Sequence, residues 1–323
     1  DTGGALPGDN HDPLTGTRPS NRLEMNINKI LWPTDGSKES GESLRLALYL
    51  ARIYGSEIIC LHVSGVQIPL TDLYPSYEGV IMDIVKDTEA RFGKEFKRIE
   101  TENPGVRFST DVVRGSVVDW IIEKAKTDGA GLIVMGKKGH GLIGSALLGS
   151  NTLKVLRNSH VPVLSVKTGG EKTEYDIKKI LVPLDISDTT DSSLTYALGL
   201  AGKLGASVTV VYVFWIDANV YELSPDLVGE MSAHSARELR LRVDAVKDRC
   251  DKDNEGAPGA GIETHVLTGV SPALTVTDYA DENGFDLIVI TTHGRKGLER
   301  IILGSESEKI IREARCPVLA LKP

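Results

Sequence analysis

The chain repeats itself, and this repeat limits its fold more than any other feature of the sequence. The segment Ile30-Leu-Trp-Pro-Thr-Asp35 returns 150 residues later as Ile180-Leu-Val-Pro-Leu-Asp185. The run Leu132–Met135 returns as Leu287–Ile290, and a glycine-rich loop that ends in Gly-Ser follows both copies. A repeat of this length is a whole domain, because solenoid repeats have periods of about 20 to 50 residues. The sequence therefore predicts two copies of one globular domain, each with a related binding loop.

Length and composition agree with two globular domains. The 323 residues leave room for two domains of about 150 residues. Hydrophobic residues make up 41% and charged residues 25%, as in ordinary soluble proteins. No apolar run approaches the roughly 18 residues of a membrane span, and no apolar N-terminal stretch resembles a signal peptide. The net charge of -8 argues against bulk binding of nucleic acid, which requires a basic face. We expect a cytoplasmic protein that binds neither membrane nor nucleic acid.

The boundaries of the domains follow from changes in composition. Residues 1–24 are rich in Gly, Pro, Asp, Asn and Thr without apolar periodicity, which is typical of a disordered tail. Met25 directly precedes the first predicted strand and is the expected natural start, so the tail is either native or added for expression. We expect one domain at 25–168, a short charged and Gly-rich linker at 169–176, and a second domain at 177–323.

Short apolar strands alternate with amphipathic helices in both repeats, which predicts parallel βαβ units. Continuous apolar strands are expected where helices cover both faces of a sheet. The predicted fold class is therefore α/β, with two tandem doubly wound, Rossmann-like domains. The predicted strands of repeat one are 27–33, 57–63, 106–113, 132–135 and 161–166, with helices at 37–54, 78–100, after Gly115 and after Gly149; those of repeat two are 179–183, 207–213, 262–267, 287–290 and 318–321.

The glycine loop of repeat one has the features of a phosphate-binding loop. It reads Gly136-Lys-Lys-Gly139 and, after nine further residues, Gly149-Ser150, where a helix is predicted to begin. Amides at a helix N-terminus bind anions, and glycines let the backbone approach a phosphate closely. Ser150 can donate from its hydroxyl group, and Lys137 or Lys138 can neutralise charge. The loop is typical of a cradle for a di- or triphosphate, although an ordinary strand-to-helix turn would look similar.

Asp35 ends the first predicted strand, and the glycine loop follows the fourth. Ligands of open α/β sheets bind at the carboxyl ends of the strands, where the strand order reverses. If the first and fourth strands are neighbours, Asp35 and Gly136 flank one crevice. A carboxylate repels phosphates, so Asp35 would accept hydrogen bonds from a base or a ribose. The alternative is a turn or helix-cap role within Asp35-Gly-Ser37, where Ser37 is an equally good cap.

Other motifs are absent or accidental. Gly139-His-Gly-Leu-Ile-Gly144 matches the dinucleotide fingerprint in letters, but it follows the fourth strand and has no acidic residue about 20 positions on. The sequence has no Walker-type loop and no nucleophile elbow. The three cysteines and seven histidines show no metal-ligand spacing. His140 and His293 lie in the glycine loops, where they contact ligand or solvent. We predict no catalytic constellation and no metal site.

Several of these segments together resemble the universal stress protein family, once per repeat from Met25 onward. They are Ile30 to Ser37, Leu61-His-Val63, the glycine loop and Val161-Pro-Val-Leu164. The resemblance implies a five-stranded parallel sheet of order 3-2-1-4-5 in each domain, with helices on both faces, and a site for ATP, with or without Mg²⁺. It also implies pairing through the last strands, 163–167 with 318–322 within the chain or between chains of a homodimer. Carried over by position, the cofactor-binding residues of repeat one are Pro33, Thr34, Asp35, Val63, Met135, Gly136, Lys137, Gly139, His140, Gly149, Ser150 and Asn151.

Repeat two departs from this pattern at two positions. Thr291 replaces the first glycine, and its Cβ atom should hinder the close approach of a ligand. Glu306 stands where repeat one has Asn151, and a carboxylate at a helix N-terminus satisfies the dipole and repels phosphate. Arg295 and Lys296 could compensate, but we predict that repeat one binds ATP better. The remaining cofactor-binding positions of repeat two are Asp185, Val213, Gly294, Gly304 and Ser305.

Three functions remain open at this point. The first is a nucleotide-dependent regulatory protein of the stress response, which holds ATP with at most slow hydrolysis and acts through an unknown protein partner. The second is an ATPase or nucleotidyl-transfer enzyme on the same sheet. The third is a nucleotide-free scaffold that dimerises through its last strands. ATP retained through purification would exclude the third function, and release of ADP or AMP faster than hours would favour the second.

Overall fold

The computed structural model describes most of the chain after the predicted tail. The tail with Met25, the first part of the linker (169–173) and the central parts of both glycine loops lie outside the described residues. The predicted domain boundaries therefore stay predictions. The described residues are 27–65, 78–137, 148–167, 174–185, 191–215, 225–253, 261–292 and 303–322.

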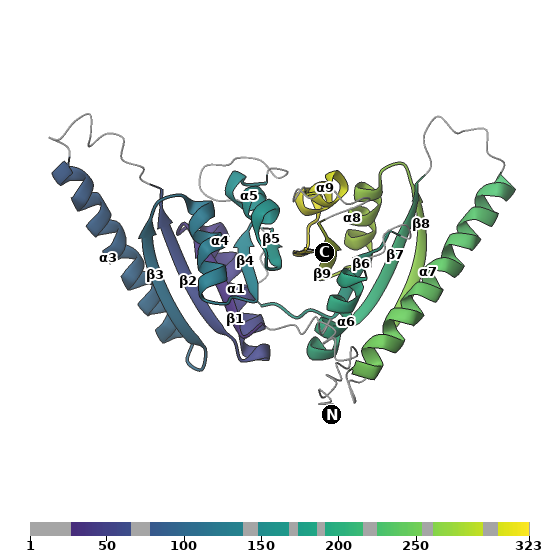
Figure 1. The fold of residues 1–323 in the computed structure, drawn as a ribbon, viewed down its shortest axis with the longest axis horizontal. Coiled ribbons are helices and arrows are strands. Elements are labelled where there is room, and N and C mark those ends of the chain that lie inside the picture. Colours follow the sequence, from purple (N-terminus) through teal and green to yellow (C-terminus); the bar gives the residue numbers. More distant parts are fainter. Residues whose placement is uncertain are drawn as a thin grey trace, which may run out of the picture.

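Repeat one consists of parallel strands that alternate with helices, as the sequence predicts (Figure 1). Helix α1 begins where the Ser37 side chain accepts a hydrogen bond from the Ser40 amide, so the cap falls on Ser37. It ends at Gly55, whose φ of 67° is the left-handed conformation that closes many helices. The elements are β1 (Lys29–Thr34), α1 (Lys38–Tyr54), β2 (Glu57–Ser64), α3 (Glu78–Glu102), β3 (Arg107–Arg114), α4 (Val117–Thr127), β4 (Leu132–Gly136), α5 (Ser150–Asn158) and β5 (Val163–Val166).

Repeat two has the same order of elements, and its strands begin and end within two residues of the predicted bounds. In repeat one, β5 begins two residues later than predicted, because its pairing with β4 begins at Val163 rather than at Val161. The elements are β6 (Lys179–Pro183), α6 (Ser192–Leu204), β7 (Ser207–Trp215), α7 (Pro225–Asp253), β8 (Ile262–Gly269), α8 (Pro272–Glu282), β9 (Leu287–Thr291), α9 (Ser305–Glu313) and β10 (Val318–Leu321).

The strands of both repeats form one sheet in the order β3-β2-β1-β4-β5-β10-β9-β6-β7-β8. Each half has the predicted order 3-2-1-4-5, so the first and fourth strands are neighbours. The two halves join where β5 and β10 pair antiparallel, with Leu319 opposite Leu164. The predicted pairing of the last strands within the chain is therefore present, and α3 and α7 lie at opposite ends of the molecule (Figure 1).

Two hydrophobic cores lie on the two faces of this sheet, and each includes residues of both repeats. Ile30 and Trp32 of β1 enter one core with α1, α3, α6 and α7, and Leu31 enters the other with α4, α5, α8 and α9. This alternation is the two-residue period of a strand. Leu164 and Leu319 carry the first core across the junction between the repeats. Because neither core is confined to one repeat, the two repeats pack as one body.

Polar contacts between helices α5 and α9 add to this junction. The Lys322 ammonium donates to the carbonyl oxygen of Arg157 at 2.9 Å, in the last turn of α5. A cation there complements the helix dipole. The Arg157 guanidinium lies 2.8 Å from the Glu308 carboxylate, which also pairs with Arg312 at 2.8 Å. Partial burial alone would raise the pKa of Glu308, but the hydrogen bonds from Arg157 and Arg312 hold it below its usual range.

Candidate functional site

A cavity of about 570 Å³ opens at the carboxyl ends of β1, β2 and β4, beside the start of α5. Its volume is in the range of pockets that bind small molecules, about 300 to 1,000 Å³. It lies where β1 pairs with β4 and the chain winds in opposite directions, which is the expected ligand position in such sheets. Among the predicted residues, its lining includes Pro33, Thr34, Asp35, Val63, Met135, Gly136, Gly149, Ser150 and Asn151.

Asp35 takes the turn role that the sequence left open, and it also lines the cavity. Its Oδ1 atom accepts a hydrogen bond from the Ser37 amide at 3.0 Å, which closes a turn at the end of β1. The Ser37 hydroxyl then caps α1 by accepting from the Ser40 amide at 3.1 Å. The half-buried Asp35 side chain also lines the cavity. The turn therefore fixes the position of a carboxylate that lines the cavity.

A buried pair of stacked rings, Phe92 and His62, packs next to this turn. The φ of Gly36 is 76°, and a Cβ atom there would lie only 3.1 Å from Cζ of Phe92, so the position requires glycine. The Phe92 ring stacks on His62 at 3.5 Å. Burial lowers the pKa of His62, and the neutral ring donates from Nδ1 to the carbonyl oxygen of Thr34 at 2.9 Å. Sequence reasoning missed Phe92, because its partners belong to distant elements.

The start of α5 provides donors for an anion, but the Gly149 amide is not one of them. That amide donates to the carbonyl oxygen of Lys137 at 2.7 Å, which joins the two ends of the glycine loop. The amides of Ser150 and Asn151 belong to the first helical turn and have no acceptor within the helix. The Thr152 hydroxyl, which the sequence analysis did not single out, donates to the carbonyl oxygen of Gly136 at 2.9 Å. It holds the first turn of α5 against the end of β4.

Lys137 does not reach the ligand space, contrary to the prediction. Its side chain is buried, and its ammonium donates to the carbonyl oxygen of Ala314 at 2.6 Å, at the C-terminus of α9 in repeat two. Burial lowers its pKa to about 7. Its backbone amide donates to the carbonyl oxygen of Val166 at 2.8 Å. Lys137 is therefore a residue of the junction between the repeats, while Lys138, Gly139 and His140 lie outside the described residues.

The cavity combines an apolar wall with a polar end. The side chains of Leu61, Val63, Ile121 and Met135 line one part, and the N-terminus of α5 lines another. Apolar walls suit a flat ring system, whereas helix amides suit an anionic group. Asp35 is the one carboxylate among the described lining residues, so it can select hydrogen-bond donors on the ligand. Further lining residues that the sequence analysis missed are Ser40, Val117, Leu148, Thr152 and Leu153.

Repeat two arranges the corresponding residues differently. The sequence suggested that Glu306 turns to the N-terminus of its own helix, but the structure shows a different partner. Its Oε2 atom instead accepts from the Ala273 amide at 2.9 Å, at the start of the adjacent helix α8. Thr291 ends β9, and its carbonyl oxygen accepts from the Ser307 hydroxyl at 2.9 Å. The other predicted positions in the described part are Asp185, whose carbonyl oxygen accepts from Arg242, together with Val213, Gly304 and Ser305, while Gly294 lies outside it.

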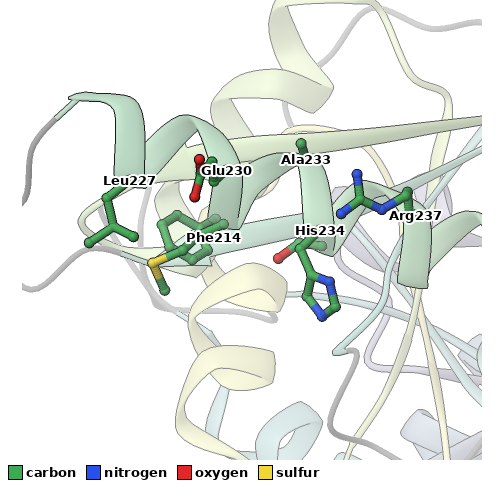
Figure 2. A pocket seen from close by; sticks show the side chains of 8 residues that line it. Phe214, Leu227, Glu230, Ala233, His234 and Arg237 are labelled. Carbon is green, nitrogen blue, oxygen red and sulfur yellow. The ribbon is translucent and has the colours of Figure 1, made fainter.

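A second hollow, of about 500 Å³, lies between the end of β7 and helix α7. It faces away from the predicted positions of repeat two, because Phe214 lines it and the adjacent Val213 packs against the core on the other face of the sheet. The hollow holds both Glu230 and Arg237, so its charge selects for neither an anion nor a cation. Figure 2 shows its side chains Phe214, Leu227, Glu230, Ala233, His234 and Arg237.

Two further findings concern the described residues. They contain no group of three or more His, Cys, Asp or Glu side chains placed to hold a metal ion. Across the same part of the chain, each helix is too short or too polar to cross a membrane.

Comparisons with known proteins agree with a duplicated fold. The model of the Universal stress protein family matches residues 26–167 and again residues 176–322. A universal stress protein of Mycolicibacterium smegmatis is 24% identical over 302 residues, which are 91% of this chain and 97% of that protein. Universal stress protein MJ0531 of Methanocaldococcus jannaschii is 34% identical over 150 residues, 45% of this chain and 82% of its own length. The crystal structure of a universal stress protein from Archaeoglobus fulgidus has a TM-score of 0.60 at 22% identity, and the match covers 92% of this chain and 99% of that one.

Proposed function

The chain belongs to the universal stress protein family as a tandem of two family domains, and on this premise we propose that it is an ATP-binding regulatory protein with its stronger site in repeat one. The observation that carries the proposal is the cavity at β1, β2, β4 and α5. All predicted positions of repeat one in the described part, apart from Lys137, line this cavity. Residues from distant parts of the sequence thus meet in one hollow of suitable volume.

Each part of the cavity corresponds to one part of ATP. Val63 and Met135 offer apolar contacts to the adenine ring. The Asp35 carboxylate accepts hydrogen bonds from amino or hydroxyl groups of the base or ribose. The amides of Ser150 and Asn151 and the Ser150 hydroxyl lie where the phosphates would be held. Among the described lining residues Asp35 is the single carboxylate, so they would leave Mg²⁺ to be held by phosphate oxygens and water.

The preference for repeat one rests on the charge beside each helix start. Repeat one has the neutral Asn151 at the cavity, and repeat two has the Glu306 carboxylate at the same position of α9. Although the Glu306 carboxylate is bound to the Ala273 amide and to Lys309, it still adds a negative charge near the start of α9, and this charge disfavours phosphate oxygens there. Thr291 also adds a side chain where Gly136 has none. Both differences weaken the second copy for the same ligand.

Matched glycine substitutions test the site and its asymmetry. Gly149 and Gly304 have nearly the same backbone conformation, with φ of -61° in both and ψ of 141° and 145°, which alanine also adopts. Gly149→Ala should weaken ATP binding about tenfold or more, equivalent to at least 1.4 kcal/mol. Gly304→Ala should leave the main binding event unchanged in isothermal titration calorimetry. Equal losses from the two variants would refute the asymmetry.

The number of nucleotides per chain tests the proposal independently. Freshly purified protein should release about one ATP per chain, counted by mass spectrometry of the released small molecules. Two per chain would contradict the preference for repeat one. No nucleotide, and no binding of added ATP, would favour the scaffold. Timed measurement of released ADP or AMP in the same sample separates a holding protein from an enzyme.

A further inference from the structure

We propose that Lys137 is a positioning residue, through which repeat two holds the phosphate-binding end of the site in repeat one. The inference deepens the proposed function and rests on it for the identity of the ligand. It comes from three hydrogen bonds of one residue, two made by its backbone at the glycine loop and one made by its side chain to the other repeat. Lys137 is not among the residues that line the cavity, so it acts through the loop.

The backbone of Lys137 joins the two ends of the glycine loop to the sheet. Its amide donates to the carbonyl oxygen of Val166 at 2.8 Å, which extends the pairing of β4 with β5 by one residue. Its carbonyl oxygen accepts from the Gly149 amide at 2.7 Å. Gly149 is the N-cap residue of α5, and the amides of Ser150 and Asn151 follow it directly. The position of Lys137 therefore sets the position of the amides that are proposed to bind phosphate.

The side chain of Lys137 ties this position to repeat two. It is only 3% exposed, and its ammonium donates to the carbonyl oxygen of Ala314 at 2.6 Å. Ala314 is the C-cap residue of α9, where the helix dipole favours a cation. The same helix begins after Gly304, the last glycine of the loop in repeat two. One helix of repeat two therefore lies at the ends of both glycine loops.

Repeat two makes the same backbone bonds without a lysine. Thr292 occupies the corresponding position, and its amide donates to the carbonyl oxygen of Leu321 at 2.8 Å. Its carbonyl oxygen accepts from the Gly304 amide, also at 2.8 Å. The turn therefore forms without a buried ammonium, whose removal from water costs free energy. Because a threonine hydroxyl is attached directly to Cβ, it is too short to span the distance that the lysine covers. The side-chain tie from Lys137 to the opposite repeat thus has no counterpart at Thr292.

The charge of Lys137 makes this tie sensitive to pH. Burial lowers the pKa of the ammonium to about 7, so its proton is exchanged near neutral pH. An ammonium donates a stronger hydrogen bond than a neutral amine, and its charge attracts phosphate. Both effects have the same sign, so the site should bind ATP more tightly when Lys137 is protonated. Lys167 disfavours the charge, and three other groups favour it when they are ionised, namely Cys316, Glu313 and Asp281.

The first test follows hydrogen exchange of the Gly149 amide by NMR in the full chain without nucleotide. Lys137→Met removes the bond to Ala314 and should raise the exchange rate about threefold at pH 6.5, because the acceptor of this amide is held less firmly. The Gly304 amide, which makes the corresponding bond to Thr292, is the internal control and should keep its rate. An unchanged Gly149 rate, or an equal rise at Gly304, would overturn the proposal.

The second test compares the affinity of wild type and Lys137→Met for ATP with Mg²⁺ by isothermal titration calorimetry. The variant should bind about threefold more weakly at pH 6, and the two proteins should bind equally at pH 9, where the lysine is neutral. The titration of ATP itself is common to both proteins and cancels in the ratio. Glu308→Gln, which removes the ion pair between α9 and α5 but no bond to the loop, should match wild type. A ratio that is the same at both pH values would mean that Lys137 only fills space, and the proposal would be wrong.

A third measurement needs no variant, in case Lys137→Met does not fold. The side-chain NMR signal of Lys137 in wild type should titrate at a midpoint about half a pH unit higher with ATP bound, because linkage makes this shift equal to the threefold change in affinity. A midpoint that ATP does not move would overturn the proposal. If ATP binds to none of these proteins, the proposed function fails, and the Gly149 exchange rate still decides whether Lys137 positions the loop.

Discussion

The buried lysine at the junction makes folding stability depend on pH in a way that can be calculated. Burial lowers the pKa of Lys137 from 10.5 to about 7. Between these values the unfolded chain carries the proton and the folded chain does not, so the free energy of unfolding rises with pH. The rise is roughly 1.4 kcal/mol per pH unit, and therefore roughly 2 to 3 kcal/mol from pH 7 to pH 9. Below pH 7 the lysine is charged in both states and this contribution is constant.

The perturbation is Lys137→Met, which keeps the length of the side chain and removes the titrating group. The variant loses the hydrogen bond to Ala314, a cost of about 1 to 3 kcal/mol that does not depend on pH. The informative quantity is therefore the change with pH in the stability difference between wild type and variant. Wild type should gain roughly 2 to 3 kcal/mol relative to Lys137→Met between pH 7 and pH 9. Charged and titrating groups near the ammonium are Cys316, Lys167, Glu313 and Asp281.

Urea unfolding followed by far-UV circular dichroism at pH 7, 8 and 9 measures this change. The matched control is Lys94→Met, which removes an exposed lysine on α3 and should show a stability difference that does not change with pH. A stability difference between wild type and Lys137→Met that is equal at all three pH values would refute the reasoning. It would mean that the ammonium remains in contact with water.

Two further predictions concern the same junction. Glu308→Gln removes a carboxylate that pairs with Arg157 and Arg312 and should cost about 1 kcal/mol of unfolding free energy at pH 7. Since the pKa of this carboxyl is lowered in the folded state, the loss of unfolding free energy should shrink as pH falls below about 4. A loss in urea unfolding that is equal at pH 7 and below about 4 would contradict the ion pairs. Leu319→Ala should cost about 2 to 4 kcal/mol because Leu319 is buried in the core that both repeats share. Its calorimetric unfolding should remain one transition at a lower temperature, and two separated transitions would argue against a shared core.

The order of elements could be predicted because its signals are local. The Ser37 cap, the Gly55 helix end and the apolar runs of the strands all depend on residues near one another in the sequence. The crevice between Asp35 and Gly136 required one additional piece of information, the strand order, which only the family resemblance supplied. With that order, the positions that line the cavity follow from the carboxyl ends of neighbouring strands.

The direction of individual side chains could not be predicted in the same way. Lys137 continues the alternation of β4 for one more residue through its bond to Val166, and this carries its side chain toward α9 rather than toward the ligand. Glu306 accepts its hydrogen bond from a donor on α8, the Ala273 amide, which is a neighbour in space from another part of repeat two. In both cases the decisive partner is set by packing between elements, and the sequence contains no local sign of it.

The antiparallel pairing of β5 with β10 also affects how the sequences of the two repeats can diverge in evolution. Two separate chains joined at this edge would come apart on dilution, whereas covalent linkage keeps the partner edge at a fixed effective concentration. Repeat two therefore remains a permanent partner of repeat one whether or not it keeps a ligand. Under this arrangement a difference between the repeats such as Glu306 in place of Asn151 leaves the pairing of β5 with β10 intact.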